Sequence, residues 1–447
     1  MTASDAGTAP ASPLQRAGAG RARLQVALDF TILQRALKAA AEAVAGGAEL
    51  LEAGTPLLKS EGLEAVRQLK ARFPAIPIVA DTKTMDAGRI EMEMAAKAGA
   101  SFATVLGAAS PGTIRECVEV GRNYGIAVIV DLVNVADPVA AARSAEQLGA
   151  AAVNVHCGID QQMLGQDPFA TLTRVRQAVG LTVFVAGGIN SETAATAARA
   201  GADVVVVGGA ITKAADATAA ARAIVAALQE GRAQATTEFR RYGPEQIREA
   251  YLKASTPNIS DAMHRGGVLA GLVSFVPGLK TAGRALTVRT YPGDWAKPVQ
   301  AIDLAQPGDV IVIDSGGRPP AVWGELATES CIQRKLAGVV IDGAIRDVDA
   351  IRALGFPAFA RCASPHAWEP KGFGEIGQPI VIGGVRVATG DWIVGDDSGV
   401  VHVPQERAVE VANRALDVLE MENRVRGEIR AGGTLSSVME LYRWEKA

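Results

Sequence analysis

Three charged residues follow a short apolar run and indicate what chemistry the chain could perform. Asp81, Lys83 and Asp86 are spaced as Asp-x-Lys-x-x-Asp directly after the run IPIV. Charges at the end of a buried strand must be paired or put to use, because desolvated charge is costly. A lysine beside carboxylates would remain charged and could stabilise an enolate-like anion, and we expect Asp86 to orient Lys83.

Other polar residues and glycines end a series of similar apolar runs. LQVALD, AELLEAG, IPIVADTK, SFATVLGAA, IAVIVDLV, AAVNVHCG, TVFVAGG and VVVVGGA alternate with Ala-rich amphipathic stretches of helical length. Eight strand–helix units in roughly 205 residues predict a (β/α)8 TIM barrel, with an open doubly wound sheet as the alternative. The active site of such a barrel lies at the carboxyl ends of its strands. The residues at those ends, besides the charged triplet, are Asp29, Glu52, Thr104, Asp131, His156, Gly187, Gly188, Gly208 and Gly209.

Residue type assigns a role to several of these positions. Glu52 and Asp81 carry hard oxygen donors on adjacent strands, which suits Mg2+. His156 is a candidate proton shuttle, and the late glycines offer backbone N–H groups to a phosphate. Some of the residues at the strand ends have a plainer interpretation. A single aspartate such as Asp29 or Asp131 is more often a helix cap than a catalyst, and a lone histidine such as His156 is more often structural. The coincidence of compatible groups on successive strands favours a site.

The composition bounds the class of protein. The chain has 447 residues, a net charge of -3 and four cysteines without metal-type spacing. These features predict a multidomain cytoplasmic enzyme and argue against a nucleic-acid binder. The sequence contains no run of about 18 apolar residues, so we expect no membrane-spanning segment.

The composition also changes along the chain. We expect a loose tail over 1–22, the barrel over 23–230, a polar linker over 231–246, and a second α/β domain with C-terminal helices over 247–447. All five tryptophans lie in the second half.

The barrel motifs resemble a known family. ADTKTMDAG, DLVNVADP and VHCGIDQQ are similar to the 3-hexulose-6-phosphate synthases of the orotidine-phosphate decarboxylase superfamily. The resemblance implies a Mg2+-dependent, reversible aldol condensation of ribulose 5-phosphate, a sugar phosphate, with formaldehyde. It also implies a dimer in which Asp86 reaches the neighbouring site. The related keto-sugar-phosphate decarboxylases remain the alternative, although Ile159 and Asp160 stand where those enzymes carry an arginine.

A second constellation lies in the second half of the chain. Glu325 follows the Gly/Pro-rich loop GGRPPAVWG, and twenty residues separate it from Arg346-Asp347, which come after the run GVVIDGAI. An arginine fork binds two carboxylate oxygens, and Asp347 could hold a divalent metal. The plainer interpretation is a local salt bridge on a turn.

These motifs, with STPNISDAMHRGG and GDWIVGDDSGVVHVP, resemble the RraA-like family, which contains 4-hydroxy-4-methyl-2-oxoglutarate aldolases. The resemblance implies that Arg346 binds a 2-oxo acid carboxylate beside a Mg2+ or Mn2+ held by Asp347 and Glu325. It also implies trimers or hexamers, so we expect a homo-oligomer. Some members are ribonuclease regulators, which leaves a non-catalytic binding domain as the alternative.

Overall fold

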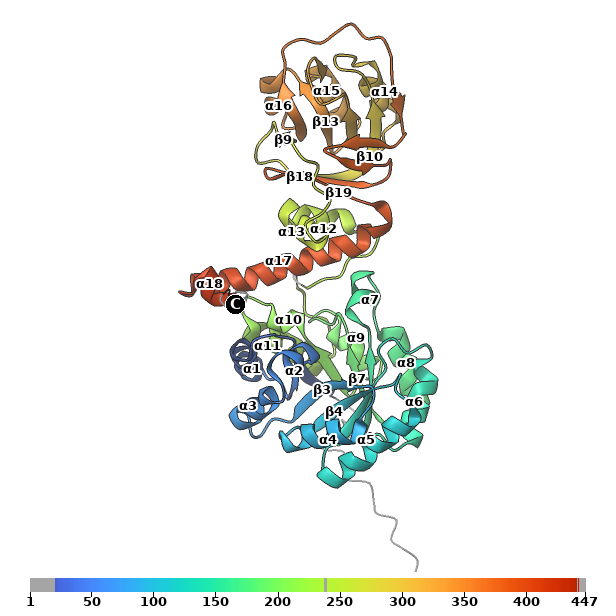
Figure 1. The fold of residues 1–447 in the computed structure, drawn as a ribbon, viewed down its shortest axis with the longest axis vertical. Coiled ribbons are helices and arrows are strands. Elements are labelled where there is room, and N and C mark those ends of the chain that lie inside the picture. The colour runs from blue at the N-terminus through green and yellow to red at the C-terminus, as the bar shows by residue number, and fades with distance from the viewer. Residues whose placement is uncertain (1–20, 237–238, 440, 442–447) are drawn as a thin grey trace, which may run out of the picture. The chain divides into compact units, whose positions relative to one another are not determined.

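The computed structural model describes residues 21–236, 239–439 and 441. Most of the expected N-terminal tail lies outside these residues. The chain forms two compact units (Figure 1). Among the described residues, one unit contains the barrel with 21–162, 166–236, 239–240, 420–439 and 441. The other contains 163–165 and 241–419.

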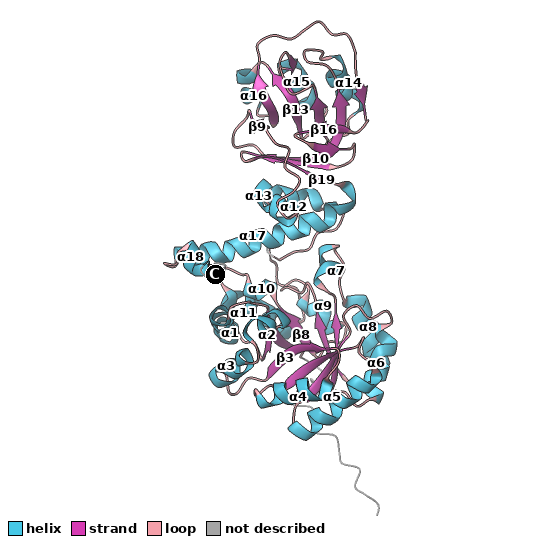
Figure 2. Ribbon diagram, in the orientation of Figure 1, coloured by secondary structure: helices cyan, strands magenta, loops and turns pink. Residues whose placement is uncertain are grey.

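The first unit is a closed barrel of parallel strands (Figure 2). Each strand pairs with the next along the chain, and the first closes the ring on the eighth. The predicted barrel is therefore confirmed, and the open doubly wound alternative is wrong. The strands are β1 (Arg23–Leu28), β2 (Leu50–Ala53), β3 (Ile78–Thr84), β4 (Phe102–Leu106), β5 (Ala127–Asp131), β6 (Ala152–His156), β7 (Thr182–Ala186) and β8 (Val204–Val207).

Helices surround the strands because both faces of each strand are apolar. Leu24, Val26 and Leu28 pack outward against the helices, whereas Phe102 and Phe184 meet edge to face inside the barrel, 6.1 Å between ring centres. This filled interior leaves the carboxyl ends of the strands for polar groups. The helices are α1 (Leu33–Ala45), α2 (Thr55–Glu61), α3 (Glu64–Arg72), α4 (Gly88–Lys97), α5 (Pro111–Tyr124), α6 (Pro138–Gln147), α7 (Ile159–Met163), α8 (Phe169–Ala178), α9 (Ala194–Arg199), α10 (Gly209–Thr212) and α11 (Ala217–Glu230).

The second unit is built on a mixed sheet ordered β19-β18-β10-β11-β13-β14-β9, with β12 added to β13 and β15 added to β10. The central strands β10, β11, β13 and β14 are parallel, so their carboxyl ends share one edge. The strands are β9 (Val273–Ser274), β10 (Thr281–Arg289), β11 (Val310–Asp314), β12 (Ala321–Trp323), β13 (Gly338–Ile345), β14 (Ala358–Ala363), β15 (Glu375–Ile376), β18 (Trp392–Asp396) and β19 (Gly399–Val403), beside a hairpin of β16 (Ile380–Ile382) and β17 (Val385–Val387).

Helices again bury the sheet of this unit. Residues of α14 (Ala296–Leu304), α15 (Glu325–Gln333) and α16 (Val348–Leu354) share one apolar core with the parallel strands. Another core joins α12 (Ile247–Lys253), α13 (Thr256–Ala262) and the start of α17 (Ala408–Arg430) to β18 and β19. The expected second α/β domain is present.

The C-terminal boundary differs from the expected one. Residues from 420 onward, which include the end of α17 and α18 (Leu435–Val438), group with the barrel unit instead of the second domain. The reason is that two side chains of α17 pair with α1: Arg424 with Glu42 at 2.9 Å, and Glu428 with Arg35 at 3.4 Å. No helix in the described ranges is long and apolar enough to cross a bilayer.

Candidate active site

The pairing of β3 with β4 is irregular where β3 ends, at the residues that carry the charges of Asp81, Lys83 and Asp86. The register between β3 and β4 shifts between Ala80 and Thr84, and Lys83 adopts a left-handed φ of 48°. That conformation costs a non-glycine residue about 1–2 kcal/mol, so surrounding contacts must hold it. One such contact is the Lys83 backbone N–H, which donates to Thr104 Oγ1 at 2.9 Å.

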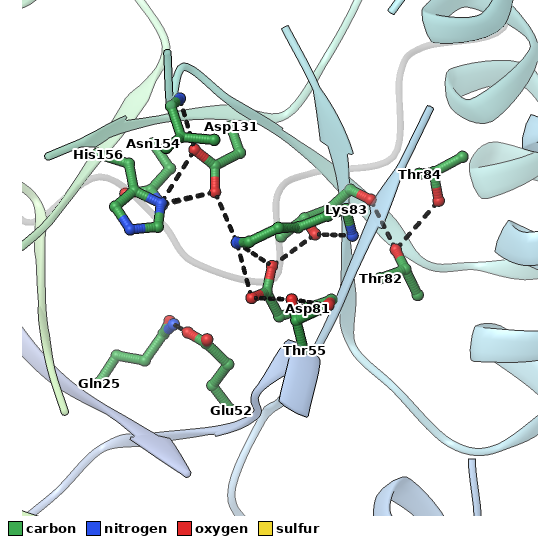
Figure 3. A network of polar contacts seen from close by, with 12 residues as sticks. Gln25, Glu52, Thr55, Asp81, Thr82, Lys83, Thr84, Asp131, Asn154 and His156 are labelled. Atoms are coloured by element: carbon green, nitrogen blue, oxygen red, sulfur yellow. Dashed lines mark hydrogen bonds and ion pairs between the residues drawn. The ribbon is translucent and has the colours of Figure 1, made fainter. Parts of the chain in front are cut away.

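The Lys83 ammonium group lies between two carboxylates (Figure 3). Its Nζ is 2.8 Å from Asp81 Oδ2 and 3.2 Å from Asp131 Oδ2. Burial disfavours the charged lysine, but Asp81 and Asp131 outweigh burial and raise the pKa of Lys83. Thr55 and Thr104 donate to the two oxygens of Asp81, at 2.7 and 2.8 Å. The two carboxylates therefore favour the charged form of Lys83.

Asp131 connects the lysine to His156. Nδ1 of His156 is 2.9 Å from Asp131 Oδ2, and the backbone N–H of Val133 donates to Oδ1 at 2.9 Å. Burial opposes ionisation of Asp131, but His156 and Lys83 lower its pKa to about 2. A charged Asp131 favours the histidine tautomer with its proton on Nδ1, which leaves Nε2 as a proton acceptor.

Two further carboxyl groups complete the acidic surroundings of Asp81. Glu52 is buried, and burial followed by repulsion from Asp81 and Asp29 raises its pKa well above the usual range. Gln25 donates a hydrogen bond to it. The Asp29 side chain is exposed, and its pKa is raised by desolvation first and then by repulsion from Asp81.

The glycines after β7 and β8 border this cluster. Gly187 and Gly188 both have positive φ, 114° and 68°. A Cβ on Gly187 would lie 2.3 Å from the carbonyl oxygen of Cys157, the residue after His156. A Cβ on Gly208 would lie 3.6 Å from Asp29 Oδ2, and Gly209 begins α10. The end of β7 therefore needs glycine at Gly187, whereas a side chain at Gly208 would make only ordinary contact with Asp29.

One predicted residue lies apart from the others. The side chain of Asp86 is exposed, and within the described ranges it makes no hydrogen bond or ion pair. Asp81 and Asp131 orient Lys83 instead, so the expected orienting role of Asp86 is wrong within a single chain. Exposed apolar side chains flank it: Met85, Ile90 and Met94 are 52%, 57% and 48% exposed.

Sequence reasoning missed three neighbours of the cluster. Thr55 holds Asp81, Gln25 holds Glu52, and Asn154 Nδ2 is 3.5 Å from Asp131 Oδ2. The available signal was a polar side chain inside an otherwise apolar strand, as in LQVALD and AAVNVH.

In the second unit, the three predicted residues meet at the carboxyl edge of the parallel strands. Glu325 begins α15, and its backbone N–H donates to Asp347 Oδ2 at 3.2 Å. Arg346 follows β13, and its Nε is 3.5 Å from the same oxygen, so the local salt bridge is present. Both charged side chains remain 40% or more exposed and accessible to a ligand. Across the described residues of both units, no group of three or more His, Cys, Asp or Glu side chains is arranged so that it could hold a metal ion.

Comparison with known proteins identifies both parts of the chain. A model described as the orotidine 5'-phosphate decarboxylase / HUMPS family matches residues 22–224, and one described as RraA-like (aldolase/RraA) matches 256–402. The chain belongs to the orotidine 5'-phosphate decarboxylase / HUMPS family through its barrel, which is fused to an RraA-like domain.

Within this family, the barrel is similar to proteins named 3-hexulose-6-phosphate synthase. The barrel is similar to the 3-hexulose-6-phosphate synthase of Methylomonas aminofaciens, with 45% identity over 201 residues, which cover 45% of this chain and 96% of the relative. The Mycobacterium gastri 3-hexulose-6-phosphate synthase is 38% identical over 206 residues, 46% of this chain and 99% of the relative. A crystal structure of 3-hexulose-6-phosphate synthase from Salmonella typhimurium is 37% identical, covers 47% of this chain and 100% of that one, and has a TM-score of 0.46.

Proposed function

We propose that the barrel catalyses the reversible aldol condensation of ribulose 5-phosphate with formaldehyde to give 3-hexulose 6-phosphate. The observation that carries this proposal is the placement of Lys83 between Asp81 and Asp131, with His156 on Asp131. Proteins named as synthases of this product share up to 45% identity with the barrel in the comparisons above, which supports the choice of reaction.

The cluster supplies a base and a stabiliser for the anion. Nε2 of His156 takes the proton from C1 of the ketose, because Asp131 holds the other ring nitrogen. Lys83 stabilises the resulting 1,2-enediolate as a fixed positive charge. The enediolate carbon then forms the new bond to the formaldehyde carbon, and the alkoxide that results takes up a proton. The reverse sequence releases formaldehyde.

Two buried carboxyl groups support the proposal of a divalent cation in the barrel. Glu52 and Asp81 offer hard oxygens. Burial is the main cause of the raised pKa of Glu52, and repulsion from Asp81 and Asp29, which a cation would relieve, adds to it. We propose Mg2+ at these residues, where it would polarise the ketose oxygens. The glycine ends of β7 and β8 would receive the phosphate through backbone N–H groups.

The test is consumption of formaldehyde and ribulose 5-phosphate by the purified chain, with Mg2+ and with EDTA. We expect turnover by the wild type only with metal, and none by Asp81→Ala. Glu64→Ala removes an exposed carboxylate on α3 and should retain full activity. Absence of turnover by the wild type under every condition would overturn the proposal, and decarboxylation of keto-sugar phosphates would then be assayed.

For the second domain, we propose metal-dependent cleavage or decarboxylation of a 2-oxo acid. Arg346 would bind the carboxylate through its two-pronged group, and Asp347 with Glu325 would hold Mg2+ or Mn2+. Release of pyruvate or CO2 from candidate 2-oxo acids tests it, with Arg346→Ala as the impaired variant and Arg352→Ala, an exposed arginine on α16, as the control. Equal rates for both variants would favour the alternative, a non-catalytic binding domain.

We also propose that the barrel pairs with a second copy of itself through the face around Asp86. The exposed Met85, Ile90 and Met94 form an apolar surface there, which pairing would remove from water. In the pair, Asp86 would reach the partner's cluster.

A further inference from the structure

Two segments outside the matched barrel contact the loops that follow β7 and β8. The linker segment (234–236 and 239–240) and the helix segment (420–428, the end of α17) both belong to the barrel unit. The family match ends at 224, and the Methylomonas aminofaciens relative is covered over 96% of its length by 201 residues. A barrel of that length has no counterpart of either segment.

The linker segment is bonded to the loop after β7. Gln234 and Ser191 are joined twice: the Gln234 N–H donates to the Ser191 carbonyl at 3.0 Å, and Ser191 Oγ donates to the Gln234 carbonyl at 2.9 Å. Nδ2 of Asn190 donates to the carbonyl of Phe239 at 3.1 Å. Asn190 and Phe239 are both buried, so these bonds are shielded from water.

Asn190 connects the linker segment to the turn that contains Gly187 and Gly188. It lies two residues after Gly188, and its Oδ1 accepts from the N–H groups of Glu192 and Thr193 at the start of α9, at 3.0 and 3.2 Å. The loop from Gly187 to Thr193 is therefore held at one end by β7 and at the other by Asn190.

The helix segment is bonded to the loop after β8. Arg424 is buried, and its Nη1 donates to the carbonyl of Ala214 at 3.1 Å. Ala214 lies just after α10, the short helix that begins at Gly209. The same guanidinium pairs with Glu42 at 2.9 Å and Glu428 at 3.1 Å, which fixes its orientation.

The two segments are also joined to each other. The backbone N–H of Phe239 donates to Oε1 of Glu420 at 2.7 Å in a buried contact. A hydrogen-bonded chain thus runs from the helix segment through Phe239 to Asn190. Glycine-rich loops lose much conformational entropy on binding, and holding them beforehand reduces that loss.

We propose that the linker segment and the helix segment are positioning elements for phosphate recognition, which hold the loops 187–193 and 208–214 ready for the sugar phosphate. Arg424 and Asn190 are the positioning residues. The proposal rests on the proposed function of the barrel, because it assigns those two loops to the phosphate.

The test compares variants of the full chain. Arg424→Ala should raise KM for ribulose 5-phosphate and the inhibition constant of inorganic phosphate about tenfold, the size expected for one hydrogen bond to a charged group. We expect kcat and KM for formaldehyde to stay within about twofold of wild type. Arg424→Lys keeps one charged donor and should fall in between. Arg426→Ala removes an exposed arginine of the same helix and should match the wild type.

Amide hydrogen exchange gives a readout that does not need activity. In Arg424→Ala, amide exchange in the loop 208–214 should be faster than in the wild type. In Asn190→Asp, exchange in the loop 187–193 should be faster. This variant keeps the oxygen that accepts from Glu192 and Thr193 but loses the N–H that donates to Phe239. Inorganic phosphate should slow exchange in both loops of the wild type. Faster exchange without a change in phosphate binding would overturn the proposal, as would unchanged exchange. If inorganic phosphate slows exchange in the wild type but the wild type shows no synthase turnover, the proposed reaction is wrong and the positioning proposal is not contradicted.

Discussion

At the scale of single residues, one ammonium group organises the barrel site. Lys83 pairs with both Asp81 and Asp131 and so reduces the repulsion between their carboxylates at the end of the barrel. Asp131 in turn holds His156, so the charge of one residue determines the proton position on another. Removing Lys83 would leave two buried carboxylates without their shared positive charge, which is more costly than the pairing is stabilising.

The lowered pKa of Asp131 predicts a loss of stability in acid. Its folded-state pKa of about 2 lies below its ordinary value of 3.8, so its ionised form stabilises the fold above about pH 4, and this contribution disappears as the pH falls toward 2. The size is about 2 kcal/mol. Denaturant titrations between pH 2 and 5 should show a shallower pH dependence for Asp131→Asn. Identical slopes for variant and wild type would contradict the assigned pairing.

The fixed charge of Lys83 predicts a catalytic loss that binding does not explain. Lys83→Met should lower kcat about 10²–10³-fold, the usual effect of removing one stabiliser of a developing anion. Steady-state kinetics with ribulose 5-phosphate and formaldehyde would measure it. Lys97→Met, which removes an exposed lysine on α4, serves as the control. A kcat within a factor of three of wild type would exclude Lys83 as the stabiliser.

At the scale of elements, strand ends with unusual backbone geometry determine where the chemistry lies. The register shift at the end of β3 allows Lys83 to adopt its left-handed conformation. The turn after β7 needs Gly187 for a different reason, since any Cβ there would collide with the backbone of the loop after β6.

Substitution of Gly187 tests this close approach. Gly187→Ala should destabilise the fold by about 2–4 kcal/mol, because strain at positive φ adds to a contact with a backbone oxygen. Gly125→Ala is the matched control: Gly125 also has positive φ, but no atom lies within 4 Å of the added Cβ. The control should lose only about 1 kcal/mol in chemical denaturation. Equal losses for the two variants would show that the approach to Cys157 is not tight.

At the scale of the whole molecule, the chain combines two families, and the candidate site of each part lies at the carboxyl edge of parallel strands. Four side chains of the barrel that are close in sequence are exposed, and other described residues do not bury them. They are the apolar Met85, Ile90 and Met94 and the charged Asp86. A second copy of the chain is our proposed partner for that face.

Placing a charge on this face should separate the barrels. Ile90→Arg is expected to reduce the assembly measured by sedimentation velocity and to lower synthase activity, because Asp86 would no longer reach the partner's cluster. Leu304→Arg places the same charge at a similarly exposed apolar residue of the second unit, and its effect on synthase activity should be small. Full activity in a dissociated Ile90→Arg chain would show that each barrel is complete by itself.

Local sequence patterns determined the architecture of both domains. Eight apolar runs with polar or glycine ends predicted the barrel, because strands buried on both faces must be apolar throughout. The same pattern predicted which residues meet at one rim, since parallel strands end together. Asp81, Lys83, Asp131 and His156 are joined there by hydrogen bonds, as their positions at strand ends implied.

Only the tertiary structure decided which of these residues touch and which do not. Asp86 is close to Lys83 in sequence, yet Asp131, 48 residues away, pairs with the lysine, because the barrel brings β3 and β5 to one rim. Likewise, helical periodicity predicted α17 but could not assign its end to the barrel. That assignment depends on Arg424 and Glu428 meeting Glu42 and Arg35 from α1, a contact between residues more than 380 positions apart that no local pattern records.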